Sequence, residues 1–214
     1  NAPSRWRNDA SLPARDRRDL LKWLNSSDKP VGDVMDAPVP LKFERGWSMG
    51  TPDWIVPGSR HVEVPGTGTM PYQMDLVETG LTEDRWVSGY EILPEVRSVV
   101  HHVLVRVVAP GQNARNEGEG TGYWAAYVPG NSAHRYPEGF ARKLPAGSRM
   151  SFQIHYTPNG TAVRDRIQVG LFFSRKPPEN EVKTLPLANL RISIPPGAPL
   201  ISPVTILTGS FATI

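Results

Sequence analysis

Apolar and polar residues alternate in short runs along most of the chain. In the run SFQIHYT (151–157), Phe152, Ile154 and Tyr156 share one face of an extended strand, whereas the polar residues, His155 among them, share the other. Similar runs are WIVPGSRHVEVPGTGT, MPYQMDLV, DRWVSGYEIL, RSVVHHVLVRVV, GYWAAYVPG and RIQVGLFF. Short runs with this spacing predict an all-β fold, an antiparallel jelly-roll-type β-sandwich with no long helix inside residues 50–194.

A helical period appears near the start of the chain. The segment SLPARDRRDLLKWLNS (11–26) places Pro13 where the first turn of a helix tolerates proline. Its apolar residues recur at helical intervals and form one stripe. This stripe consists of Leu20, Leu21, Trp23 and Leu24. The sequence therefore predicts a short N-terminal helix near residues 14–25.

The chain divides into three regions by its proline content and by the pattern of its apolar residues. Residues 1–42 combine the predicted helix with a Pro-rich connector, so we expect a helical appendage and a linker. Residues 43–194 are expected to form the sandwich, with a last strand at Leu190–Ile194. Residues 195–214 are expected to be a linker and the truncated start of a second domain. Because the chain begins at Asn1 without an apolar leader, we expect a processed protein or a piece of a longer one.

Composition narrows the functions that this fold could serve. Pro and Gly, at 22 and 19 of the 214 residues, support many turns between short strands. The net charge is only +3, and basic residues alternate with acids in residues 15–19, so we expect no nucleic-acid partner. No stretch approaches the roughly 20 apolar residues of a membrane span. The absence of cysteine excludes disulfides, thiolate metal sites and covalently attached haem.

The histidines are the main candidates for chemistry. His101 and His102 lie together in the apolar run VVHHVLV, where an imidazole buried without a partner is costly. In one interpretation, one of this pair is a satisfied core residue, the other faces solvent, and His155 is a surface residue. In the other interpretation, all three bind one metal ion. The remaining two, His61 and His134, stand in turn-rich stretches and are expected to be plain surface residues.

A shared site for His101, His102 and His155 sets a geometric condition. Three imidazoles without a carboxylate or thiolate suit a copper ion that cycles between two oxidation states, although imidazole also binds zinc, iron and nickel. Adjacent strand residues point to opposite faces, so the adjacent pair can reach one ion only where the strand ends or bulges. Metal–imidazole bonds of about 2.0 Å would bring the ring nitrogens within about 4 Å of each other.

No other pattern in the sequence indicates a reactive site. Gly66-Thr67-Gly68 lacks the third glycine and the helix of a dinucleotide-binding loop. The acidic residues show no paired arrangement for acid–base catalysis, and no serine stands in a nucleophile elbow. We therefore assign no catalytic residue. The residues alone predict a β-sandwich, in which a three-histidine metal site is one of the two interpretations of His101, His102 and His155.

Two motifs resemble those of a known enzyme family. The run SVVHHVLVRV, followed further along by PAGSRMSFQIHYTPNG, is similar to the first catalytic domain of the type II, ascorbate-dependent copper monooxygenases. This is the family of the peptidylglycine α-hydroxylating and dopamine β-monooxygenases. The resemblance covers roughly Trp54–Arg175, and YVPGNSAHRYPEGFARKLPAGS between the motifs is most similar to bacterial members. The matching positions imply that His101, His102 and His155 bind the electron-transfer copper.

The resemblance also implies an oxidoreductase function and a set of partners. The copper would accept an electron from ascorbate or a c-type cytochrome and pass it to a second copper, where O2 hydroxylates a substrate C–H bond. In the bacterial members the domain follows a c-type cytochrome, and residues 1–35 resemble the tail of such a cytochrome domain. A periplasmic or secreted location follows from the same resemblance.

The family's second copper site has no counterpart in this sequence. That site uses a His-x-His pair and a Met in a second domain, yet no His or Met follows His155. The resemblance therefore implies one copper ion in this chain and a second copper domain in cis or in trans. We expect the chain to be the electron-transfer domain of such an enzyme. The alternative is a non-catalytic β-sandwich module that binds copper, carbohydrate or protein.

Overall fold

The computed structural model describes residues 11–28, 31–36, 38–39, 46–113, 122–184 and 196–197. The chain divides into two compact units, with the division between residues 43 and 44. The strand predicted at Leu190–Ile194 and most of the linker predicted at 195–214 lie outside the described residues.

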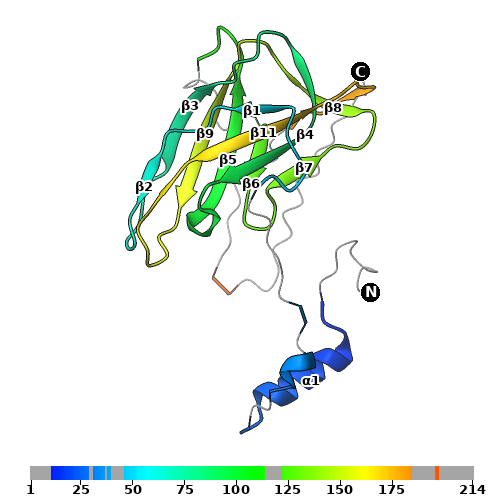
Figure 1. Cartoon of the computed structure of the whole chain (residues 1–214), viewed down its shortest axis with the longest axis vertical. Coiled ribbons are helices and arrows are strands. Elements are labelled where there is room, and N and C mark those ends of the chain that lie inside the picture. The colour runs from blue at the N-terminus through cyan, green and yellow to red at the C-terminus, as the bar shows by residue number, and fades with distance from the viewer. Residues whose placement is uncertain are drawn as a thin grey trace. The chain divides into compact units, whose positions relative to one another are not determined.

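The first unit contains the predicted helix, α1 (Ala14–Leu24), followed by the 3-10 turn η1 (Val34–Asp36) (Figure 1). Pro13 directly precedes α1, and its carbonyl accepts a hydrogen bond from the N–H of Arg17 at 2.9 Å. The helix predicted near residues 14–25 is therefore confirmed. No helix among the described residues is long and apolar enough to cross a membrane.

The second unit consists of short strands, as the alternating runs predict. One sheet contains, in order, β1 (Trp54–Val56), β11 (Ile167–Phe173), β4 (Arg85–Pro94), β8 (Phe140–Leu144) and β12 (Asn180–Glu181), with β7 (Ala133–Arg135) also paired to β4. The other large sheet contains, in order, β3 (Gln73–Glu78), β9 (Arg149–Tyr156), β5 (Val100–Val108) and β6 (Ala125–Tyr127). A small third sheet pairs β2 (Val62–Val64) with β10 (Val163–Asp165). The described pairings are antiparallel except that of β12 with β8.

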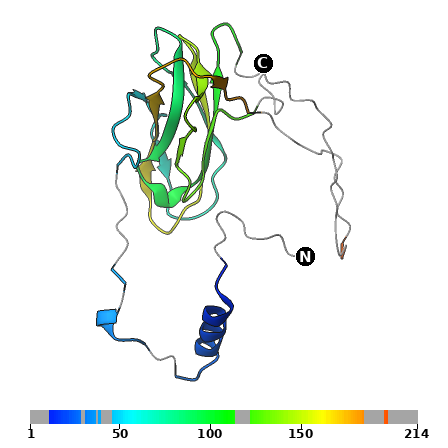
Figure 2. The ribbon, with the colours of Figure 1, turned by 90° about the vertical axis from the view of Figure 1, so that its right-hand side faces the viewer.

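Both large sheets contribute to one hydrophobic core. Figures 1 and 2 show the ribbons of these sheets from two directions. Ile92 and Leu171 reach it from the sheet of β4 and β11, and Val103, Phe152 and Ile154 reach it from the sheet of β5 and β9. All five side chains are essentially inaccessible to solvent. Two sheets packed on a shared core make a sandwich, so the predicted all-β sandwich with one short N-terminal helix is confirmed.

The two faces of β9 follow the predicted alternation. Met150, Phe152, Ile154 and Tyr156 are buried in the core, and each residue between them is half-buried. His155 therefore points away from the core, on the outer face of its sheet.

Glu91 of β4 is 0% exposed and lies beneath the segment that leads into β1. Its carboxylate accepts hydrogen bonds from the N–H and the hydroxyl of Ser48, both at 2.9 Å, and from the N–H of Met49 at 3.0 Å. The same segment covers the neighbouring β11, where a Cβ added at Gly170 would lie 2.6 Å from Cγ of Pro52. Residues 47–52 are therefore part of the sandwich unit.

Four short strands lie outside the predicted runs. β7 and β8 occur in the segment AHRYPEGFARKL, where proline, glycine and charged residues interrupt the alternation, and β10 and β12 have only three and two residues. One consequence concerns His134, which lies in β7 opposite Tyr90 of β4 rather than in a loop. The turn-rich sequence around His134 was therefore a poor guide to its backbone.

Candidate metal centre

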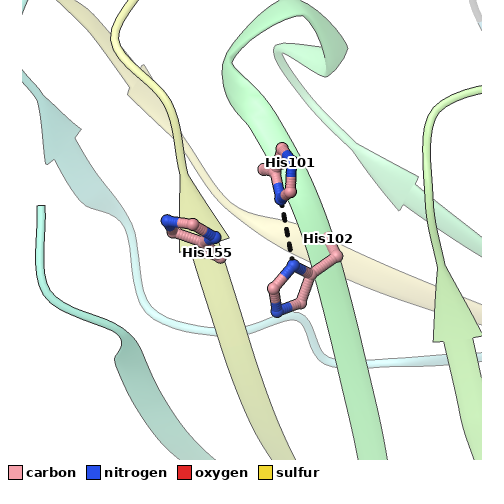
Figure 3. A group of neighbouring side chains, drawn as sticks. All are labelled: His101, His102 and His155. Atoms are coloured by element: carbon pink, nitrogen blue, oxygen red, sulfur yellow. Dashed lines mark hydrogen bonds between the residues drawn. The ribbon is translucent and has the colours of Figure 1, made fainter. Parts of the chain in front are cut away.

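Three imidazoles converge on the outer face of the β3–β9–β5–β6 sheet (Figure 3). His101 and His102 are the second and third residues of β5, and His155 is the second-to-last residue of β9. One ring nitrogen from each residue lies within 4.8 Å of the others. The ring centroids are 4.9 to 5.4 Å apart. The upper limit of 4.8 Å on the nitrogen–nitrogen distances is close to the about 4 Å expected for ligands closed around an ion, and the Nδ1 atoms of His101 and His102 are 3.1 Å apart.

A β-bulge allows the adjacent pair to face the same way. Val100 of β5 stands opposite Tyr156 of β9, and the next paired residue is His102, opposite His155. His101 is therefore the extra residue of the bulge, which frees it from the strict alternation of the strand. The condition that the sequence imposed on a shared site is met, since β5 bulges at the histidine pair.

Hydrogen bonding within the site is incomplete. Nδ1 of His101 lies 3.1 Å from Nδ1 of His102, so one ring must carry its proton there and the other must accept it. Nδ1 of His155 is buried and has no hydrogen-bond partner among the described residues. A buried ring nitrogen without a partner is costly, and coordination to a metal ion would supply one.

The electrostatics of the site favour the neutral form of His102. Burial lowers the pKa of His102 below its usual value, and the neighbouring His155 and His101 lower this pKa further. Neutral imidazole is the form that binds metal ions. The ring of His102 is therefore held in its metal-binding state at neutral pH.

An aromatic side chain forms one wall of the site. The ring of Tyr72 lies 4.9 Å from that of His155 and 5.7 Å from that of His102, measured between centroids. Tyr72 directly precedes β3, whose first residue, Gln73, stands opposite Ile154 of β9. The tyrosine is 54% exposed and His101 is also exposed, so the site remains open to solvent.

These residues fit a metal ion that prefers nitrogen ligands. The cluster contains three imidazoles and no carboxylate, and the chain contains no cysteine. Within the described part of the chain, no second group of three or more His, Asp or Glu side chains gathers in this way. The geometry therefore offers one site with three nitrogen ligands, and a metal ion could enter or leave it from the solvent side.

The other two histidines lie apart from this cluster. Nε2 of His61 is 3.4 Å from a carboxylate oxygen of Glu95, and the ring of His134 packs between Tyr90 and Tyr136. Neither belongs to the metal-binding group. The structure thus brings together the three histidines that the sequence singles out and leaves out the two that it sets aside.

Comparisons of the chain with protein-family models, with curated proteins and with solved structures find no match.

Two residues near the site were not predicted from sequence, Tyr72 and the buried Asp165. Tyr72 reaches the site through the pairing of β3 with β9, and Asp165 contacts Tyr156 next to the site. The first relation depends on which strands pair and the second on a side-chain contact between β9 and the separate sheet of β10. Neither leaves a local pattern in the sequence.

Proposed function

We propose that His101, His102 and His155 bind one copper ion, and that the sandwich unit is the electron-transfer domain of an ascorbate-dependent copper monooxygenase. The observation that carries this proposal is the convergence of three imidazoles, with no carboxylate or thiolate among them, at a bulge in β5. Such a ligand set suits an ion that is stable in two oxidation states.

The choice of copper rests on the ligands and on the sequence motifs together. Imidazole alone would also accept zinc, iron or nickel. The VVHHVLV and SFQIHYT motifs resemble the electron-transfer copper motifs of the monooxygenase family, and their histidines are the ones that lie together. Both lines of support converge on the same three residues.

The chain's own residues would bind and orient the ion. Copper, when bound, would supply a one-electron couple. His102 and His155 stand opposite each other on paired strands, so backbone hydrogen bonds fix their separation and limit rearrangement when the charge of the site changes. In this scheme the three histidines are ligands, and none acts as an acid or a base.

The proposal includes partners for both ends of the electron path. Ascorbate or a c-type cytochrome would donate the electron at the solvent-accessible side, where His101 and Tyr72 are exposed. A second copper domain, in cis or in trans, would receive it and carry out hydroxylation with O2. A periplasmic or secreted location is part of the same proposal.

Copper titration of the purified chain tests this function. We expect one Cu(II) per chain, an electron paramagnetic resonance (EPR) spectrum with nitrogen ligands, and loss of that spectrum on reduction by ascorbate. We expect no hydroxylation by this chain alone, because no His or Met follows His155 to form a second site. Equal copper binding after replacement of all three histidines by alanine would contradict the assignment.

A hollow on the other sheet favours a second candidate, a non-catalytic module that binds carbohydrate or protein. This hollow has a volume of about 520 Å³. Its aromatic lining residues are Tyr136, Phe140, Phe172 and Phe173. Calorimetric titration of the metal-free chain with neutral oligosaccharides tests this candidate. Binding that is weakened by Phe140→Ala and unchanged by His155→Ala would support it.

A further inference from the structure

A buried carboxylate contacts Tyr156, the residue of β9 that directly follows His155. Asp165, the last residue of β10, is 0% exposed. Its Oδ2 accepts a hydrogen bond of 2.9 Å from the phenol of Tyr156, and its Oδ1 accepts one of 2.6 Å from the backbone N–H of Val96. Both carboxylate oxygens therefore have partners, one at the end of β9 and the other in the bend that precedes the 3-10 turn before β5.

These two partners lie on either side of the histidine cluster in the chain. Tyr156 directly follows His155. Val96 opens the corner formed by the 3-10 turn η2 (Arg97–Val99), which leads into β5 and so into the bulge at His101. Asp165 thus connects the strand that carries one ligand with the turn that delivers the other two.

Further contacts fasten the same corner to the segment after β9. The N–H of Thr157 donates to the carbonyl of Val99 at 2.8 Å, and the side-chain amide of Asn159 donates to the hydroxyl of Ser98 at 3.1 Å. Asp165 and its partner Tyr156 are both fully buried, at 0% and 1% exposure. A buried, fully hydrogen-bonded carboxylate tolerates little change in the positions of its partners.

We infer that Asp165 is a positioning residue for the three-histidine site, an inference that rests on the proposed function. By fixing Val96 relative to Tyr156, it sets the point at which β5 begins to pair with β9. A shift of one residue in this register would remove the bulge and turn one histidine of the pair toward the core. The carboxylate therefore selects the register in which both His101 and His102 face His155.

Copper binding by variants of Asp165 tests this inference. Asp165 acts through Tyr156 and Val96 and not through a hydrogen bond to a histidine. Asp165→Ala should therefore weaken Cu(II) binding by about 10-fold, the lower end of the range for groups that orient metal ligands, and should change the EPR parameters of the bound ion. Asp165→Asn should restore both, because its amide can accept from Val96 and donate to the oxygen of Tyr156. A purely structural role would not predict a changed spectrum in folded protein.

Glu91→Ala provides the matched control. Glu91 is also a fully buried carboxylate that accepts backbone N–H groups, but it belongs to β4 in the other sheet. The variant should lower the melting temperature as Asp165→Ala does, yet leave copper affinity and the EPR spectrum unchanged. If folded Asp165→Ala protein has wild-type affinity and a wild-type spectrum, the positioning role is wrong.

Two further measurements keep the inference testable. If Asp165→Ala does not fold, Tyr156→Phe removes only the phenol hydroxyl, and wild-type copper binding with a wild-type spectrum in this variant would overturn the inference. If the wild-type chain binds no copper, the proposed function fails by itself. In that case the positioning role is tested in the metal-free protein by NMR. The role requires that the ring 15N signals of His101 and His102 shift in the Tyr156→Phe variant, and unchanged signals would contradict it.

Discussion

At the scale of single residues, the effect of His155 on copper binding can be measured apart from its effect on the stability of the fold. Its side chain is half-buried on the outer face of β9, so its removal opens no cavity in the core. His155→Ala should weaken copper binding by more than the roughly 100-fold upper range for an outer-shell residue. The free energy of unfolding of the metal-free protein should change by less than about 1 kcal/mol. Copper titration beside thermal melting measures both.

His134→Ala is the control for this prediction. His134 is exposed in β7 and packs between two tyrosines, outside the metal-binding group. Its removal should leave copper affinity unchanged. Equal copper affinity in the His155 variant and the wild type would exclude His155 as a ligand.

Asp165 gives the metal-free protein a defined pH dependence. Burial raises the pKa of this carboxyl above its usual 3.8, although hydrogen bonds from Val96 and Tyr156 act in the opposite direction. The folded chain therefore binds a proton at this carboxyl more tightly than the unfolded chain does. Its contribution to stability is fully present below pH 3.8 and is lost as pH rises through the raised pKa.

Asp165→Asn isolates this contribution because it removes one titrating group and keeps the others. The melting temperature of the wild type, minus that of the variant, should become more positive as the pH is lowered from about 8 to about 4. Melting curves of the two metal-free proteins in matched buffers measure the difference. A difference that is independent of pH would contradict the raised pKa.

At the scale of elements, the side chains of β9 that pack in the core alternate with those on its outer face, where His155 lies. Phe152 is fully buried, so Phe152→Ala should lower the free energy of unfolding by about 3–5 kcal/mol. Gln153, its neighbour, lies on the outer face, and Gln153→Ala should change that free energy by no more than about 0.5 kcal/mol. Urea denaturation measures both values. Similar losses in the two variants would show that the two faces of β9 are not distinct.

The sequence predicts elements well where alternation is long and poorly where it is short. The eight residues of β9 alternate without a break, so both the strand and the outward direction of His155 could be predicted. β7 and β8 could not, because proline, glycine and charged residues interrupt their pattern. The bulge at His101 could be stated only as a condition, since a bulge is defined by the partner strand and leaves no mark in its own sequence.

At the scale of the whole molecule, the sandwich unit should fold and bind copper without the helical unit. A chain that begins at residue 44 keeps Ser48 and Met49, which hydrogen-bond the buried Glu91. Its melting temperature and copper affinity should match those of the full chain. Calorimetry and copper titration of this truncated chain test the expectation, and loss of copper binding would contradict it.

A chain that begins at residue 52 is the matched comparison. It lacks the three hydrogen bonds that Glu91 accepts from Ser48 and Met49, and it lacks Trp47, whose ring lies beside Gly170 of β11. Water can replace these donors only in part, and each hydrogen bond to a charged group is worth about 1.5–3 kcal/mol, so the free energy of unfolding should fall by at least about 3 kcal/mol. Equal stability of the two truncated chains would show that residues 44–51 do not belong to the sandwich.

The pattern of apolar and turn residues predicts the fold class but not the order of the strands in the sheets. Alternating runs and frequent turn residues suffice for a sandwich. The placement of β9 between β3 and β5 does not follow from either, because it depends on pairings between distant segments. This placement is what sets Tyr72 and His102 on the two sides of His155. The three histidines could therefore be named from sequence, whereas their surroundings could not.

Two identical residues stand side by side at the bulge, so deletion of the codon for either His101 or His102 encodes the same shorter chain. That chain would hold one imidazole opposite His155 in an unbulged strand, and so a site with two ligands. In the reverse direction, duplication of a single histidine codon inserts the bulged residue and adds the third nitrogen while the flanking pairs keep their partners. A cluster of three imidazoles on this sheet thus differs by one codon from a pair of imidazoles.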